Sequence, residues 1–284
     1  MSSIHVIVDS TAQIPEEMLA AHANLHIVPL KVIIGDDEWE EDKISAARLF
    51  SLVQERGIHP RTSQPAVGDF IKVIAPLAEA GVQVIIITIS GGLSGTAQGA
   101  RTAAQMIGGK NIYVVDSGTT AMGMVDMARI ALTMAGEGKS AVEIAAYLAA
   151  MVKVTHTVFM PDTLTYLYKG GRIGGAAALV GNVLQIKPLL YLVDGKVAVL
   201  DKVRTRARAL ARMVDEVSKY RNIEYIGLGY IEEPEQAMQL KEELQKLYPY
   251  LSITLSRLGA VLGAHLGPGL IGLIFREKIS DGTF

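Results

Sequence analysis

The side chains best placed to do chemistry lie in one short stretch. An apolar run, Ile85-Ile86-Ile87-Thr88-Ile89, leads into Ser90-Gly91-Gly92-Leu93-Ser94-Gly95-Thr96, and an alanine-rich helical pattern follows over 97–107. This order predicts a buried strand, a turn of glycines and hydroxyls, and a helix N-terminus. Such a turn favours an anionic ligand, because unpaired backbone N–H groups and the helix dipole both attract negative charge. Open α/β sheets usually bind ligands at this edge.

Three familiar motifs do not fit this turn. No lysine follows the glycines, as a P-loop requires, and their spacing differs from the dinucleotide fingerprint. Gly92-Leu93-Ser94-Gly95 is one residue short of the nucleophile elbow of hydrolases. An ordinary turn in which Ser94 or Thr96 caps the helix remains an alternative.

A second loop strengthens the case for an anion. Arg61-Thr62-Ser63-Gln64 places two hydroxyls, an amide and a guanidinium between Pro60 and Pro65, ahead of a helical pattern starting at Val67. Capping again offers a simpler account. Two hydroxyl-rich loops in one domain nevertheless predict a shared polar pocket.

The predicted order of strands and helices differs between the two halves of the chain. Up to about residue 150, apolar strands alternate with helical patterns, which indicates a parallel sheet covered on both faces. Beyond that point, a hairpin signal at Asp194-Gly195 and less regular alternation indicate a mixed sheet. We therefore expect a two-domain α/β protein: a parallel-sheet α/β domain over 1–155 and a mixed-sheet α+β domain over 156–284.

The amino-acid composition argues against several classes of protein. The 284 residues carry 27 basic and 29 acidic side chains, a net charge of −2, so no global charge favours nucleic acid. Cysteine is absent, and no His, Asp or Glu spacing indicates a metal site. The N-terminus has no signal-peptide pattern, and no apolar run reaches the roughly 18–20 residues that span a bilayer. We expect a cytoplasmic protein without metal or cofactor, in at most transient contact with a membrane surface.

Two further places merit attention. His265 lies in the glycine-rich stretch Gly263–Gly269, which we interpret as a loop before the last strand, either reaching a pocket mouth or partner or simply bonded to backbone. Arg204 and Arg206 lie in a basic run at a helix start, and most of that run is expected to be a solvated face. The acidic run 36–42 is also interpreted as a solvated loop.

Together these motifs resemble the DegV family. The matching stretches span the chain: Val8-Asp9-Ser10-Thr11-Ala12, Thr62-Ser63-Gln64-Pro65, Ser90–Thr96, Val115-Asp116-Ser117, Lys169-Gly170-Gly171-Arg172-Ile173, Lys187-Pro188, Val203-Arg204-Thr205-Arg206 and His265-Leu266-Gly267-Pro268-Gly269. Ala66 departs from the family pattern, which has Ser after the proline.

The resemblance implies a bacterial protein that holds a long-chain fatty acid between two lobes and has no catalytic residues of its own. It would present the acid to a separate ATP-dependent fatty acid kinase, which makes the acyl phosphate for phospholipid synthesis. By the same resemblance, Thr62 and Ser94 contact the carboxylate. The headgroup or the partner would be met by a second set of residues: Ser63, Gly95, Thr96, Arg204 and His265. Arg206 competes with Arg204 for that role.

Two other functions stay open at this point. One is a serine acyl hydrolase with Ser94 as nucleophile and His265 as base, which lacks both the elbow and an identified third carboxylate. The other is a regulator that binds a different small anion, since the loops by themselves specify only negative charge.

Overall fold

The computed structural model describes residues 4–180 and 186–279. Its contacts divide the chain into two compact units. The first holds the chain up to Lys31, Ser63–Lys153 and Ile279, and the second holds Val32–Thr62 and Val154–Lys278. The sequence placed a single boundary at residue 155; the structure has a crossing between Lys153 and Val154, and it also groups residues 32–62 with the second unit.

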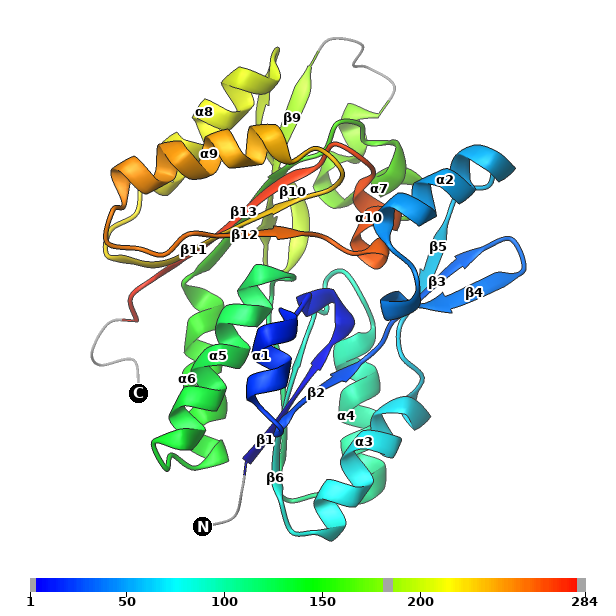
Figure 1. The fold of residues 1–284 in the computed structure, drawn as a ribbon, viewed down its shortest axis with the longest axis vertical. Helices are drawn as coiled ribbons and strands as arrows, with labels where there is room; N and C mark the ends of the chain where they lie inside the picture. The colour runs from blue at the N-terminus through cyan, green and yellow to red at the C-terminus, as the bar shows by residue number, and fades with distance from the viewer. Residues whose placement is uncertain (1–3, 181–185, 280–284) are drawn as a thin grey trace. The chain divides into compact units, whose positions relative to one another are not determined.

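The first unit is built on a parallel sheet of order β2-β1-β6-β7 (Figure 1). Its strands are β1 (Ile4–Asp9), β2 (Leu25–Val28), β6 (Gln83–Thr88) and β7 (Ile112–Asp116). Its helices are a 3-10 turn η1 (Ser10–Ala12), α1 (Glu16–Ala21), α3 (Val67–Glu79), α4 (Thr96–Ile107), α5 (Met122–Gly136) and α6 (Ala141–Lys153). This is the parallel α/β arrangement that the apolar strands predicted.

Both faces of this sheet are covered. Ile7, Ile86 and Phe70 belong to a core cluster that joins one sheet face to α3 and α4. Side chains alternate along a strand, so the neighbouring Val6 and Ile87 point to the opposite face. There α5 and α6 pack against the strands. Burial on both faces explains why these strands are apolar without alternation.

The second unit contains a six-stranded mixed sheet of order β10-β9-β8-β13-β11-β12. Its strands are β8 (Thr155–Met160), β9 (Lys187–Val193), β10 (Lys196–Val203), β11 (Ile223–Tyr230), β12 (Thr254–Arg257) and β13 (Ile271–Glu277). Of the neighbouring strands in this sheet, only β11 and β12 pair in parallel. Asp194-Gly195 joins β9 to β10 as the predicted hairpin, with both residues at positive φ.

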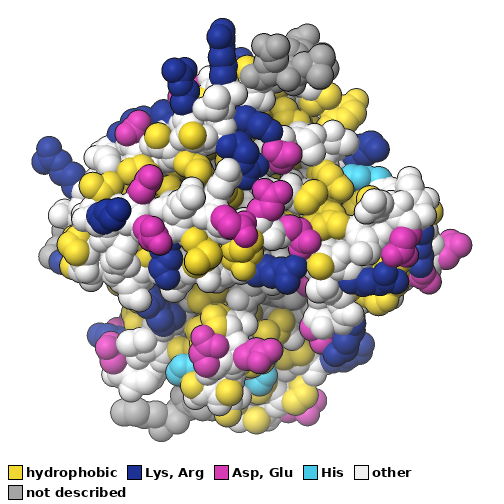
Figure 2. Space-filling model, turned by 45° about the horizontal axis from the view of Figure 1, so that its top comes forward, with side chains coloured by type: hydrophobic (Ala, Val, Ile, Leu, Met, Phe, Trp, Pro, Cys, Tyr) yellow, Lys and Arg dark blue, Asp and Glu magenta, His cyan; other side chains and the backbone are white. Residues whose placement is uncertain are grey.

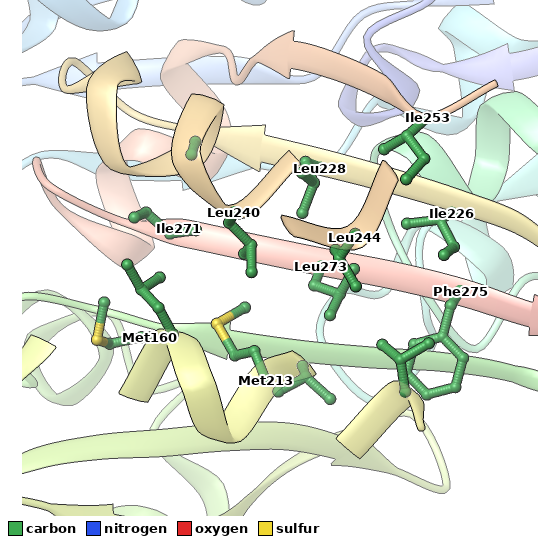
Figure 3. Packing of buried hydrophobic residues seen from close by; sticks show 14 of the residues in the cluster. Met160, Met213, Ile226, Leu228, Leu240, Leu244, Ile253, Ile271, Leu273 and Phe275 are labelled. Atoms are coloured by element: carbon green, nitrogen blue, oxygen red, sulfur yellow. The ribbon is translucent and has the colours of Figure 1, made fainter. Parts of the chain in front are cut away.

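Two long helices, α8 (Arg206–Val217) and α9 (Pro234–Leu247), cover one face of this mixed sheet. Figure 3 shows their apolar side chains, among them Met213, Leu240 and Leu244, meeting Leu273 and Phe275 of β13. The unit also has shorter helices: η2 (Glu41–Lys43), α2 (Ala46–Arg56), α7 (Thr165–Lys169), η3 (Gly174–Leu179) and α10 (Ala260–Leu266).

A three-stranded sheet of order β4-β3-β5 contains two of the points at which the chain passes from one unit to the other. Its strands are β3 (Lys31–Ile34), β4 (Asp37–Glu40) and β5 (Arg61–Ser63). The chain enters the second unit within β3 and leaves it within β5, so Thr62 and Ser63 are bonded neighbours assigned to different units.

Candidate functional site

The turn before α4 has an open helix N-terminus. Gly95 is the N-cap residue and supplies no side-chain hydrogen bond. Ser94 Oγ lies 2.8 Å from Thr96 Oγ1 and accepts a long hydrogen bond of 3.3 Å from Thr96 N. The N–H groups of Ala97 and Gln98 lie in the first helical turn and have no intrahelical acceptor. This uncapped turn is therefore an anion-binding geometry that also offers a half-buried serine hydroxyl.

Two aspartates fix the strand ends beside this turn. The Asp9 carboxylate is fully buried and accepts from Ile89 N at 2.6 Å, and from both the N–H and the hydroxyl of Thr11. Burial raises the pKa of Asp9 to about 6, against the opposing effect of these hydrogen bonds. Asp116 accepts from Gly91 N through both carboxylate oxygens, at 3.0 and 3.1 Å.

The second hydroxyl-rich loop reaches this turn within the first unit. The side chain of Gln64 lies so close to Gly95 that a methyl group on Gly95 would collide with Gln64 Oε1. Pro65 O and Phe70 border Gly99, one helical turn further along α4. Gln64 and Gly95 are thus neighbours, and a polar pocket shared by the two loops stays a prediction.

In the second unit, the side chains of Thr62 and His265 form a hydrogen bond. Thr62 Oγ1 lies 2.7 Å from His265 Nε2, while His265 Nδ1 is buried without a hydrogen-bond partner in the part of the chain that the structure describes. Burial, with further contributions from the nearby Arg172 and His59, lowers the pKa of His265 to about 4. His265 is therefore neutral at pH 7, with the Arg172 guanidinium nearby.

The interpretation of the 263–269 stretch as a loop is wrong for its first half. His265 lies in the last turn of α10, which ends at Leu266, and residues 267–270 form the connection to β13. Gly263 allows this helix to pack closely, since an added Cβ would lie 3.3 Å from Phe50 and 3.4 Å from Leu49 of α2. Glycine here serves helix packing, although its abundance indicated a loop.

The acidic run also differs from its interpretation as a solvated loop. Glu41 is 6% exposed, and its Oε1 accepts from Val261 N at 3.1 Å, at the first turn of α10. A carboxylate at this end of a helix satisfies an unpaired N–H group and complements the dipole. Glu41 therefore helps to fix the helix that carries His265.

The structure separates the two arginines that competed for one role. Arg206 donates from Nε to Gln236 at 2.6 Å, and from its terminal nitrogens to Gly269 O at 2.9 Å and Asp162 at 3.1 Å. Arg204 is exposed and has no ion pair or side-chain hydrogen bond among the described residues. Arg206 is committed to the fold, and Arg204 is available to an external partner.

The predicted residues thus fall into two groups. Ser63, Ser94, Gly95 and Thr96 belong to the first unit, and Thr62, Arg204 and His265 belong to the second. Ser94 Oγ is bonded to Thr96 and His265 Nε2 to Thr62, whereas a hydrolase needs its base on the nucleophile. No three His, Asp or Glu side chains gather as a metal site within residues 4–180 and 186–279.

Comparison with known families matches residues 3–278 to the model described as an uncharacterised protein of the DegV family. This chain belongs to the DegV family. A DegV domain-containing protein of Listeria innocua is 36% identical to this DegV-family chain, over 97% of the chain and 99% of the relative. Protein DegV of Bacillus subtilis is 33% identical, over 97% of the chain and 100% of the relative.

Solved structures of the family share the fold. A DegV family protein of Thermus thermophilus, described as fatty acid binding, superposes with a TM-score of 0.88 and 29% identity, over 97% of this chain and 100% of that one. DegV of Bacillus subtilis, described as a fatty acid binding protein, gives 0.87 and 31%, over 98% and 100%. These matches confirm the two-part α/β architecture expected of this DegV-family chain.

Two surface features complete the description of this DegV-family chain. Figure 2 shows Lys and Arg side chains interspersed with Asp and Glu over the face in view, so neither sign dominates that face. Among the residues described here, no helix has both the length and the apolar character to cross a membrane.

The sequence placed Gln64 in the second polar loop but not among the expected ligand contacts, and it gave no role to Glu41. Asp9 and Asp116 stood out only within the stretches that resemble the family. A weak signal existed for the aspartates, since each ends a strand beside the strand that leads into the glycine turn. No local signal marks Glu41, because its partner Val261 lies 220 residues away.

Proposed function

We propose that this chain binds a long-chain fatty acid and presents its carboxylate to a separate ATP-dependent kinase. The uncapped turn that carries Ser94 is the observation on which the proposal depends, because it supplies hydrogen-bond donors for a carboxylate. The Thermus and Bacillus structures, described as fatty-acid-binding, support the ligand class through their likeness to the whole chain.

We assign the carboxylate contacts to Thr62 and Ser94. A buried carboxylate is tolerated only when it is hydrogen-bonded or paired. When the proton of His265 is on Nε2, that N–H donates to Thr62 Oγ1 and leaves the threonine hydroxyl proton free for the ligand. Ser63, Gly95 and Thr96 would support the headgroup.

Apolar burial would supply most of the affinity. Each methylene removed from water contributes about 0.8 kcal/mol, so a dozen contribute on the order of 10 kcal/mol before the entropic costs of binding. We therefore expect the headgroup contacts to fix the position of the acid, while burial of its acyl chain supplies the driving force.

The partner is proposed to be a fatty acid kinase that transfers a phosphoryl group from ATP to the carboxylate, in the cytoplasm, for phospholipid synthesis. Arg204 supports such an encounter because it is exposed and uncommitted. His265 would lie near the headgroup rather than act as a base, since its lowered pKa makes it a weak one. The chain itself would need no cofactor.

Native mass spectrometry of protein purified from a bacterial host, followed by denaturing extraction, tests the proposal. We expect one long-chain fatty acid per chain. A chain that carries none and also refuses added oleate and palmitate would exclude fatty-acid binding. Acyl phosphate formed by the chain alone with ATP would contradict the need for a separate kinase, and ester turnover lost in Ser94→Ala would favour the hydrolase.

A further inference from the structure

Backbone hydrogen bonding in the turn before α4 changes sharply at Gly95. The N–H groups of six consecutive residues, 89–94, all have acceptors: Asp9, Thr119 O, Asp116, Ser90 Oγ and, for the last two, Ser90 O. The N–H of Gly95 has no acceptor among the residues that the structure describes. The donors left for a ligand therefore begin directly after a fully anchored segment.

Asp116 is the unusual member of this set of acceptors. Both of its carboxylate oxygens accept from Gly91 N, and Oδ1 also accepts from Gly118 N at 3.1 Å. Asp116 ends β7 opposite Thr88 of β6, so it joins the neighbouring strand to the turn. Gly91 is required for this contact, because an added Cβ would overlap Asp116 Oδ2.

A carboxylate beside an anion-binding turn carries an electrostatic cost. Two like charges at close range repel, and removing one of them should strengthen the binding of the other. The hydrogen bonds of Asp116 work in the opposite direction, because they hold the backbone that leads to Ser94. Substitutions that separate charge from hydrogen bonding can tell which effect is larger.

We propose that Asp116 is a positioning residue of the carboxylate site: by holding Gly91, it sets the turn so that Ser94 and the free N–H groups of Gly95, Ala97 and Gln98 face the ligand. This rests on the proposed function at Ser94. Asp116 itself does not touch the fatty acid.

Asp116→Ala and Asp116→Asn make the decisive pair. Both remove the negative charge, but Asn keeps an oxygen for Gly91 N and Gly118 N. Positioning predicts that the Ala variant loses about tenfold or more in affinity for oleate, whereas the Asn variant binds as well as wild type or better. Equal or improved binding in both variants would overturn the proposal. Glu79→Gln, an exposed change in the same unit, controls for net charge.

A substitution at Gly91 tests the contact between Gly91 and Asp116 by steric displacement. Gly91→Ala should displace the Asp116 carboxylate and reproduce the affinity loss of Asp116→Ala. Gly68→Ala is the matched control, since its Cβ would meet nothing within 4 Å. A Gly91→Ala variant that binds oleate like wild type would contradict the proposal.

Amide hydrogen exchange separates this proposal from the proposed function. Asp116→Ala should accelerate exchange over residues 91–94 relative to Asp116→Asn, with melting temperatures compared in parallel. If wild type binds no fatty acid, the proposed function fails, and exchange alone then decides the role of Asp116. If wild type binds but the Ala variant exchanges and binds like the Asn variant, Asp116 has no positioning role.

Discussion

Thr62 Oγ1 and His265 Nε2 form a 2.7 Å hydrogen bond across 203 residues of chain. It joins β5 to the last turn of α10 inside the second unit. The bond orients the threonine hydroxyl that we assign to the ligand, so a group expected to meet the partner also affects the carboxylate site.

Removing both assigned hydroxyls should weaken lipid binding strongly. Thr62→Val with Ser94→Ala deletes two donors to a charged group, each worth about 1.5–3 kcal/mol. We expect affinity for oleate to fall by a hundredfold or more, measured by calorimetry. Thr102→Val, at a half-buried threonine on α4, is the control. Unchanged affinity in the double variant would defeat the assignment.

His265→Ala should separate binding from phosphorylation. Loss of its bond to Thr62 costs at most about one neutral hydrogen bond, roughly 0.5–1.5 kcal/mol, so affinity for oleate should fall tenfold or less. Acyl-phosphate formation with the kinase should fall much further at saturating lipid. A variant that cannot bind oleate at all would place His265 among the direct carboxylate ligands.

His265 should make the protein less stable in mild acid. Its pKa is about 4 when folded, below the ordinary value of 6.5, so the unfolded chain binds the proton first as pH falls. The contribution of His265 to the free energy of unfolding is therefore fully present above pH 6.5, and it is lost as the pH falls from 6.5 towards 4. Urea unfolding of His265→Gln should show a flatter dependence over this window.

Comparing variant with wild type isolates His265 from Asp9. The raised pKa of Asp9, about 6, makes the folded state bind the extra proton, so Asp9 changes stability in the opposite direction as pH falls. Parallel curves for wild type and His265→Gln would show that His265 does not titrate as described.

Glu41→Ala should destabilise the second unit by about 1–2 kcal/mol, because Val261 N loses its acceptor at the start of α10. Glu41→Gln keeps an acceptor oxygen and should cost less. The neighbouring Glu40 is exposed, so Glu40→Ala is the matched control. Thermal unfolding would measure all three, and equal melting temperatures for Glu40→Ala and Glu41→Ala would show that the contact contributes nothing.

Arg204→Ala should affect the reaction with the kinase, whereas Arg206→Ala should affect stability. The Arg204 change should leave the melting temperature unaltered and reduce acyl-phosphate formation with the kinase, since this side chain is exposed and unpaired among the described residues. The Arg206 change removes bonds to Asp162, Gln236 and Gly269 and should lower the melting temperature. A reversed pattern would exchange the two roles.

Features set by local sequence were predictable here. The apolar run before Ser90, the glycine turn and the Asp194-Gly195 hairpin follow from burial, backbone freedom and turn preference. Glu41 and α10 were misjudged because long-range contacts decide them: Glu41 is buried and accepts a hydrogen bond from Val261 N, and Gly263 lies in a helix that packs against α2. A charged run and a glycine-rich run look like loops when such partners are unknown.

The second unit consists of two separate segments of the chain, and this affects how the protein can fold during synthesis. Nearly all of the first unit has been synthesised once Lys153 is in place. In contrast, α2 and β5 are made early, yet their partner α10 follows about two hundred residues later. Since domains tend to fold as units during synthesis, the first unit can assemble while the ribosome is still translating. Residues 32–62 must wait until α10 has been synthesised before the Thr62–His265 bond can form.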